Sequence, residues 1–120
     1  MKGRPLRERL GFAGAGLRAA YRREASFRTH LGFSAAATIA LILLRPVPLW
    51  WALVAITVAM VLALELLNAA LEGVIDLLHP GHHPEIGVVK DMLAGAVLVA
   101  ARAALVVAAA MVVDTLDQLR

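Results

Sequence analysis

Three long apolar runs are the feature that most constrains how this 120-residue chain can fold. A helix needs about 20 mostly apolar residues to cross the hydrocarbon layer of a bilayer, so three spans fit. Apolar residues make up 61% of the chain, whereas a soluble domain has about 45–50%. We therefore predict an all-α membrane protein, a single domain over residues 1–120. A soluble helical bundle is the less favoured alternative. The three spans are expected at about 27–44, 49–78 and 88–114.

The first two runs are separated by the sequence Arg45-Pro46-Val47-Pro48. Proline stops a helix and restricts the residue before it, so this segment is expected to be a turn. The tryptophans that follow, Trp50 and Trp51, are expected to be interfacial anchors, since aromatic side chains are enriched at membrane surfaces.

The basic residues predict how the chain crosses the membrane. Eight of the 12 lysines and arginines lie in the first 30 residues. Such a cluster could bind nucleic acid, but beside an apolar run the cytoplasmic membrane face is the favoured partner. We therefore expect no nucleic acid, a cytoplasmic N-terminus and an external C-terminus in the inner (plasma) membrane. A signal peptide is not expected, because no apolar run closely follows the basic start.

The segment at about 5–24 is expected to be an amphipathic helix lying in the membrane interface. Leu17, Tyr21 and Glu24 fall on one stripe of this helix, with Arg18 and Arg22 off it. Glu24 is out of place on an apolar stripe. It is either an edge residue turned to water or a carboxylate aimed at the spans.

Four polar residues end the second run on a single helix face. At about 100° per residue, Glu65, Asn68, Glu72 and Asp76 all fall within a narrow sector. Such a face could be a polar seam that joins helices. Three carboxylates favour a functional path instead, because a charge at mid-membrane costs about 2.5–3.5 kcal/mol on insertion scales. Glu65 lies about 16 Å from Asp76 along the helix and is expected to be the deepest, which suits a general base.

The loop at 79–91 carries a second polar group. It contains His79, His82 and His83, and it ends with Lys90 and Asp91. A zinc site is disfavoured because no second cluster of ligands supports it. A lysine at the mouth of the acidic face fits phosphate binding, although a simple interfacial anchor is also possible. The chain has no cysteine and no Gly-rich phosphate loop ending in Gly-Lys-Ser/Thr.

Three motifs together resemble the small prokaryotic diacylglycerol kinases, a family that includes the undecaprenol kinases. They are Glu24-Ala-Ser-Phe-Arg28, then Glu65-x-x-Asn68-x-x-x-Glu72-x-x-x-Asp76, and Lys90-Asp91-Met after His83-Pro. The likeness covers roughly residues 12–113. It implies a homotrimer of three-span subunits with a surface helix. It also implies transfer of a phosphoryl group from ATP to a membrane lipid hydroxyl, with Mg²⁺.

The resemblance also implies roles for single residues. Glu65 matches the family's general base and Asn68 its polar neighbour, while Glu24 and Glu72 match the carboxylates that bind the metal with ATP. Five further positions match nucleotide contacts or the loop over the nucleotide: Asp76, His82, His83, Lys90 and Asp91.

Two departures from the family pattern affect these expectations. Arg4, Arg7 and Arg9 compete for one nucleotide contact near the N-terminus, and Phe12 replaces a frequent tyrosine. Arg102 interrupts the third span. It either pairs with a buried acid, such as Glu65 of some subunit, or extends outward to water.

Two functions remain open from sequence. The first is a lipid kinase acting on diacylglycerol or undecaprenol, with the stretch after His83 resembling the undecaprenol kinases slightly more. The second is a non-catalytic membrane oligomer whose acidic face serves packing or the passage of ions or protons. The Lys90-Asp91 pair and Glu24 favour the kinase, because a proton path needs neither nucleotide nor metal ligands.

Overall fold

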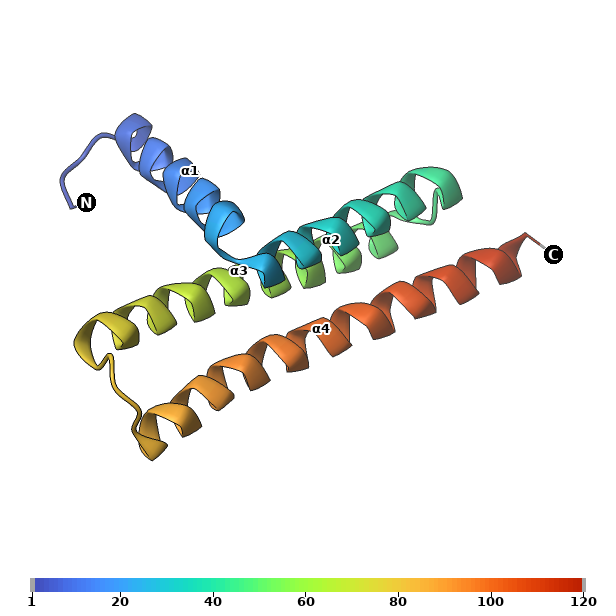
Figure 1. Cartoon of the computed structure of the whole chain (residues 1–120). Coiled ribbons are helices and arrows are strands. Elements are labelled where there is room, and N and C mark those ends of the chain that lie inside the picture. Colours follow the sequence, from blue (N-terminus) through green and yellow to red (C-terminus); the bar gives the residue numbers. More distant parts are fainter. Residues whose placement is uncertain (1, 120) are drawn as a thin grey trace.

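The computed structural model describes residues 2–119, and these form four helices with no strand. The helices are α1 (Leu6–Arg23), α2 (Ala25–Leu44), α3 (Pro48–Leu78) and α4 (Pro84–Gln118). Figure 1 shows α2, α3 and α4 running side by side, with α1 set at an angle to them. The predicted all-helical class is confirmed.

Three of the helices are long and apolar enough to cross a membrane: α2, α3 and α4. The prediction of three helices long and apolar enough to span a membrane is therefore confirmed, whereas their placement in a bilayer stays a prediction. At 31 and 35 residues, α3 and α4 are about 46 and 52 Å long at 1.5 Å per residue. A bilayer's hydrocarbon core is about 30 Å thick. Both helices thus have turns to spare beyond it.

The bounds of α4 differ most from the prediction, because the helix is four residues longer at each end than the expected 88–114. The helix begins at Pro84, four residues before the expected 88. Proline suits the first helical position because its missing N–H needs no partner there. His83 caps the helix, because its Nδ1 accepts a hydrogen bond from the Glu85 backbone N–H at 3.1 Å.

The two ends of the bundle are built differently, and we name them by the turns they contain. At the Arg45 end, the turn between α2 and α3 lies near the C-terminus of α4 (Figure 1). Here Leu41, Val54 and Met111 form a buried hydrophobic cluster that joins the three helices. At the opposite end, the His82 end, the loop from α3 to α4 projects from the bundle.

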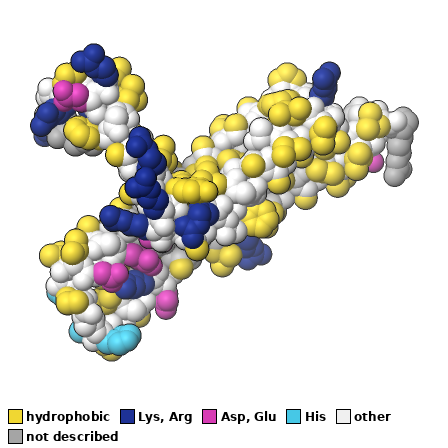
Figure 2. Space-filling view, turned by 45° about the horizontal axis from the view of Figure 1, so that its top comes forward, with side chains coloured by type: hydrophobic (Ala, Val, Ile, Leu, Met, Phe, Trp, Pro, Cys, Tyr) yellow, Lys and Arg dark blue, Asp and Glu magenta, His cyan; other side chains and the backbone are white. Residues whose placement is uncertain are grey.

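Helix α1 contacts the bundle mainly through its last turns. Ala20 is buried, whereas Leu6, Leu10 and Leu17 are exposed, each by 48% or more. Figure 2 shows lysine and arginine side chains gathered over α1 and its junction with α2. The helix therefore carries apolar and basic side chains that α2 and α3 do not cover. Its placement in the membrane interface stays a prediction.

Candidate functional site

Burial falls steadily along the acidic face of α3. Glu65 is buried, with 4% of its surface exposed, Asn68 and Glu72 are half-buried, and Asp76 is exposed. The order of depth expected from helix arithmetic is the order in the structure. The Oδ1 atom of Asn68 is buried without a hydrogen-bond partner in the described chain.

The carboxylate of Glu65 meets two polar side chains of α2. Ser26 Oγ donates a hydrogen bond to Glu65 Oε1 at 2.6 Å, and His30 Nδ1 lies 2.7 Å from the same oxygen. The second contact has ion-pair distance, but the ring N–H does not point along a hydrogen-bond direction. Neither partner was among the predicted site residues. Their spacing of four residues on an apolar helix was the available signal, since it places them on one face.

The junction between α1 and α2 is held by Arg28. Its guanidinium donates to the backbone carbonyls of Tyr21 and Arg22, at 2.6 and 3.3 Å, which are among the last carbonyls of α1. A helix leaves its last four carbonyls unpaired, so a basic side chain there stabilises the helix end. Glu24 is the single extended residue between the helices, with φ −114° and ψ 106°.

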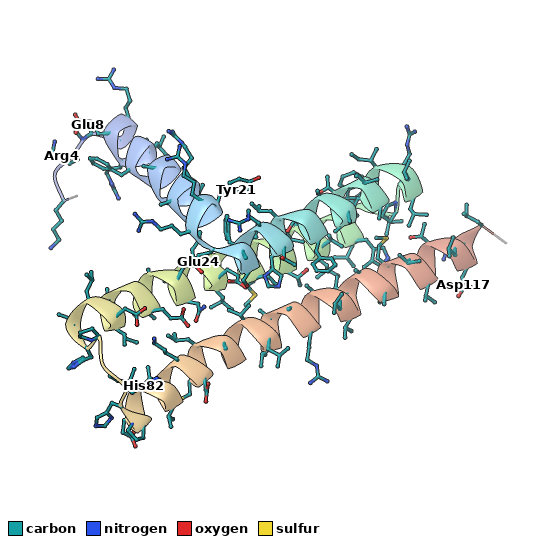
Figure 3. The ribbon with its side chains drawn as sticks, viewed as in Figure 1. Arg4, Glu8, Tyr21, Glu24, His82 and Asp117 are labelled. Carbon is teal, nitrogen blue, oxygen red and sulfur yellow. The ribbon has the colours of Figure 1, made fainter. Side chains whose placement is uncertain are left out.

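Glu24 is half-buried, and Figure 3 shows it at this junction, over α3. It is therefore turned toward the spans rather than set on the open side of α1. Glu24 and Glu72 take part in no ion pair with another described residue. No group of three histidines or carboxylates in residues 2–119 is arranged to hold a metal. Mg²⁺, however, is commonly bound by one or two carboxylates together with substrate phosphates, and this pair of oxygen donors fits that chemistry.

A polar cavity of about 150 Å³ lies at the His82 end. Four of the five residues matched to nucleotide contacts line it: Asp76, His82, His83 and Lys90. Lys90 Nζ lies 2.7 Å from Asp76 Oδ1 and joins the ends of α3 and α4. Asp91 does not line the cavity; it follows Lys90 on α4 and is therefore turned about 100° from it around the helix axis.

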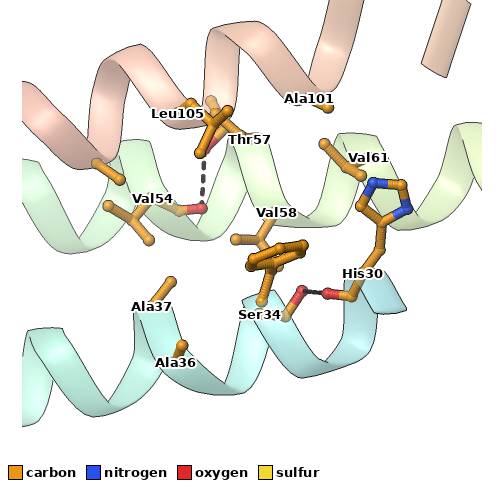
Figure 4. Close-up of a pocket in the computed structure, with 13 residues that line it drawn as sticks. His30, Ser34, Ala36, Ala37, Val54, Thr57, Val58, Val61, Ala101 and Leu105 are labelled. Carbon is orange, nitrogen blue, oxygen red and sulfur yellow. Dashed lines mark hydrogen bonds between the residues drawn. The ribbon is translucent and has the colours of Figure 1, made fainter. Parts of the chain in front are cut away.

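An apolar cavity of about 380 Å³ lies between α2, α3 and α4. Its walls are mostly small and aliphatic side chains, such as Ala37, Val58 and Ala101 (Figure 4). His30 lines this cavity and also contacts Glu65. The imidazole thus lies between the buried carboxylate and an apolar space within the spans.

A family model described as prokaryotic diacylglycerol kinase matches residues 11–112. The chain belongs to this family. The match covers α2 and α3 in full and most of α1 and α4, so it contains every residue of the candidate site.

Three relatives of the chain are diacylglycerol or undecaprenol kinases. A diacylglycerol kinase of Synechocystis is 40% identical over 80% of the chain and 55% of its own length. An undecaprenol kinase of Bacillus subtilis is 34% identical over 72% of the chain and 71% of its own length. A diacylglycerol kinase of Escherichia coli is 35% identical over 75% and 74%. The chain thus spans about half the length of the first relative and about three quarters of the others.

Two side chains outside the candidate site, Arg102 and Trp50, bear on expectations from the sequence of this diacylglycerol kinase family member. Arg102 is exposed, and within residues 2–119 the ion-pair partner of Glu65 is His30, not Arg102. Trp50, expected from sequence to be an interfacial anchor, donates a hydrogen bond from Nε1 to Asp114 at 2.9 Å and so joins α3 to α4.

Proposed function

We propose that the chain is a membrane lipid kinase that transfers the γ-phosphoryl group of ATP to the hydroxyl of diacylglycerol or undecaprenol. The observation that carries this proposal is the position of Glu65, a carboxylate 4% exposed within a membrane helix. It lies on the same helix face as the polar cavity that Asp76 and Lys90 line, about 16 Å away. The family match supports the same reaction class.

Glu65 is assigned the role of general base. The lipid hydroxyl gives its proton to the carboxylate while its oxygen bonds to the γ-phosphorus. The bond from that phosphorus to the bridging oxygen of ADP breaks, and ADP leaves with its electron pair. Phosphoryl transfer depends mainly on positioning and charge stabilisation, so a base and a set of phosphate ligands suffice without a Gly-rich loop. Asn68, one turn from Glu65, offers a buried and unpaired Oδ1 to the reacting groups.

Glu24 and Glu72 are assigned to Mg²⁺ bound with ATP. When bound, the ion neutralises charge on the phosphates during transfer. Both carboxylates are half-buried. Glu72 lies about two turns from Glu65 toward the His82 end of α3, and Glu24 lies between α1 and α2, two residues before Ser26, which contacts Glu65. This role accounts for an acidic residue at the point where the apolar stripe of α1 ends and the chain enters α2.

Asp76, His82, His83, Lys90 and Asp91 are assigned to the nucleotide. The support is the cavity that four of them share and the positive charge of Lys90 within it. A lysine binds phosphate as a point charge, whereas the two histidines offer ring nitrogens and flat faces to the base or ribose.

The proposed assembly is a homotrimer in the inner membrane, with a cytoplasmic N-terminus, α1 in the interface and an external C-terminus. The asymmetry of the basic residues supports the orientation. The family resemblance supports the trimer, in which groups from different subunits can complete one site. Cross-linking in membranes would measure the subunit number.

The test is transfer of label from γ-labelled ATP to lipid by the purified full chain in mixed micelles. Diacylglycerol and undecaprenol are offered in parallel, with Mg²⁺ or with a chelator. We expect Mg²⁺-dependent labelling of at least one lipid, and the ratio of the two rates assigns the substrate. An intact oligomer that labels neither lipid would overturn the proposal and leave the non-catalytic membrane oligomer.

A further inference from the structure

The contact between His30 and Glu65 has no part in the function proposed so far. His30 comes from α2, and its side chain is 21% exposed, whereas the side chain of Glu65 is 5% exposed. Burial of a carboxylate is costly unless donors satisfy it. A titratable side chain held 2.7 Å from the proposed base therefore needs an explanation.

Both α2 contacts reach the same oxygen of the carboxylate. Ser26 Oγ and His30 Nδ1 each approach Glu65 Oε1, at 2.6 and 2.7 Å. The second oxygen, Oε2, is left for another partner. One hydrogen bond and one close contact on the same oxygen restrict the plane of the carboxylate and leave the other oxygen to meet a hydroxyl at hydrogen-bond distance, which a general base needs.

We propose that His30 is a positioning residue for the base. It donates its Nδ1–H to Glu65 Oε1 and, together with Ser26, turns Oε2 toward the lipid hydroxyl. The inference rests on the proposed lipid kinase function and extends it to a residue of the first span. The off-line direction of the N–H is compatible with this role, because catalytic hydrogen bonds in free enzymes are often misaligned and tighten when substrate binds.

Glu65 is the charged side chain that contacts His30, and the residues that share the apolar cavity with His30 are uncharged. From α4, the residues that share the apolar cavity with it are Ala101, Ala104, Leu105 and Ala108. From α3, the cavity walls are Val54, Thr57, Val58 and Val61. None of these carries a charge. A substitution of His30 is therefore expected to act on the reaction through the carboxylate.

The experiment compares two substitutions of His30 in the full-length oligomer. His30→Ala removes the donor, whereas His30→Asn keeps an N–H at about the position of Nδ1. Ser34→Ala is the matched control, because Ser34 lines the same cavity one turn away and donates only to the His30 backbone carbonyl. The rate of lipid labelling is measured against ATP and lipid concentration, together with thermal unfolding in detergent.

We expect His30→Ala to lower kcat by about 10–100-fold, the loss expected from misplacing a reacting group by about 1 Å. The KM for ATP should stay within about twofold, because the nucleotide cavity is more than two turns away. His30→Asn should recover kcat to within about threefold of the unsubstituted chain. Ser34→Ala should leave kcat unchanged.

A double-mutant cycle tests whether His30 acts through Glu65. Glu65→Asp keeps a carboxylate but withdraws it from α2 by one methylene, so His30→Ala should cost less in that background. The inference is overturned if His30→Ala leaves kcat unchanged, if His30→Asn is as slow as His30→Ala, or if the two substitutions are additive. An unsubstituted chain that labels no lipid instead overturns the kinase proposal itself, so the two failures are distinct.

Discussion

The two ends of the α3–α4 hairpin hold their helices together in opposite ways. At the Arg45 end the contact is apolar and buried, with Met111 1% exposed against Leu41 and Val54. At the His82 end the contact is an ion pair between Lys90 and Asp76, whose side chains are 36% and 63% exposed. A buried apolar cluster contributes several kcal/mol to folding, whereas an exposed ion pair contributes about 0–1 kcal/mol.

The contacts that stabilise the bundle and the charged groups proposed to bind ligand therefore lie in different parts of the molecule. The Arg45 end joins its helices mainly through buried apolar contacts, with the hydrogen bond from Trp50 to Asp114 beside them. The charged side chains of the His82 end, which add little to folding, are then available to bind a ligand. Glu65 lies between these regions and is the buried charged residue of the described chain. Substitutions should accordingly sort into those that lower activity and those that lower stability.

The largest expected effect is on activity. Glu65→Gln removes the proposed base while keeping the size of the side chain and an acceptor for Ser26. Loss of a general base costs about 10²–10⁴-fold in rate, so kcat for lipid labelling should fall within this range. Glu8→Gln on α1 is the control, since Glu8 is exposed and its ion-pair partner within residues 2–119 is Arg4. A normal kcat for the Glu65→Gln protein would show that the buried carboxylate is not the general base.

The next effect is on stability alone. Met111→Ala opens a cavity in the Arg45 cluster, and such truncations cost about 2–5 kcal/mol in the free energy of unfolding. Unfolding in detergent by denaturant measures this change. The control is Met92→Ala on the same helix, where the side chain is 62% exposed. Equal losses from both methionines would show that the cluster is not the stabilising contact of this end.

A smaller loss of stability is expected for Trp50→Phe. The ring is largely kept, but the hydrogen bond to Asp114 is lost, and a bond to a charged acceptor contributes about 1.5 kcal/mol or more. Trp51→Phe is the matched control, because among residues 2–119 no hydrogen bond joins the Trp51 side chain to α4. Lipid labelling per folded protein should be unchanged in both. A greater effect of Trp51→Phe on unfolding would contradict the role given to Asp114.

The smallest effect on stability belongs to the His82 end. Lys90→Met breaks an exposed ion pair, so the free energy of unfolding should change by less than about 1 kcal/mol. The KM for ATP should rise about tenfold, which corresponds to about 1.4 kcal/mol. Lys2→Met removes an equal charge far from the cavity and serves as control. A large loss of stability with an unchanged KM for ATP would show that Lys90 stabilises the fold and does not bind the nucleotide.

The sequence was sufficient to predict the spans and the acidic face of α3. Both follow from local rules: the length needed to cross a bilayer and the 100° rotation per residue of a helix. The decreasing burial from Glu65 to Asp76 follows from the same arithmetic. The earlier start of α4 could also have been predicted, because Pro84 and Glu85 are favoured in a first helical turn.

The residues that contact the acidic face of α3 could not be predicted in the same way. Helix arithmetic shows which residues of α3 point in one direction, but not which residues of α2 they meet. The contact of His30 with Glu65 depends on the register between two packed helices, which is set by side-chain packing over the whole interface. The bond from Trp50 to Asp114 joins residues 64 positions apart and depends on the same packing.

That register gives the turn at Arg45 a further importance. Arg45 ends α2 in the left-handed conformation, at φ 48° and ψ 57°, which costs a residue other than glycine about 1–2 kcal/mol. Glycine would relieve the strain, but it would also remove a cation that can fix the depth of α2 at the bilayer surface. A slide of α2 by one turn, about 5.4 Å, would carry His30 away from Glu65. Arg45 can thus fix the depth of α2 in the bilayer and so keep His30 aligned with Glu65 from about 22 Å away.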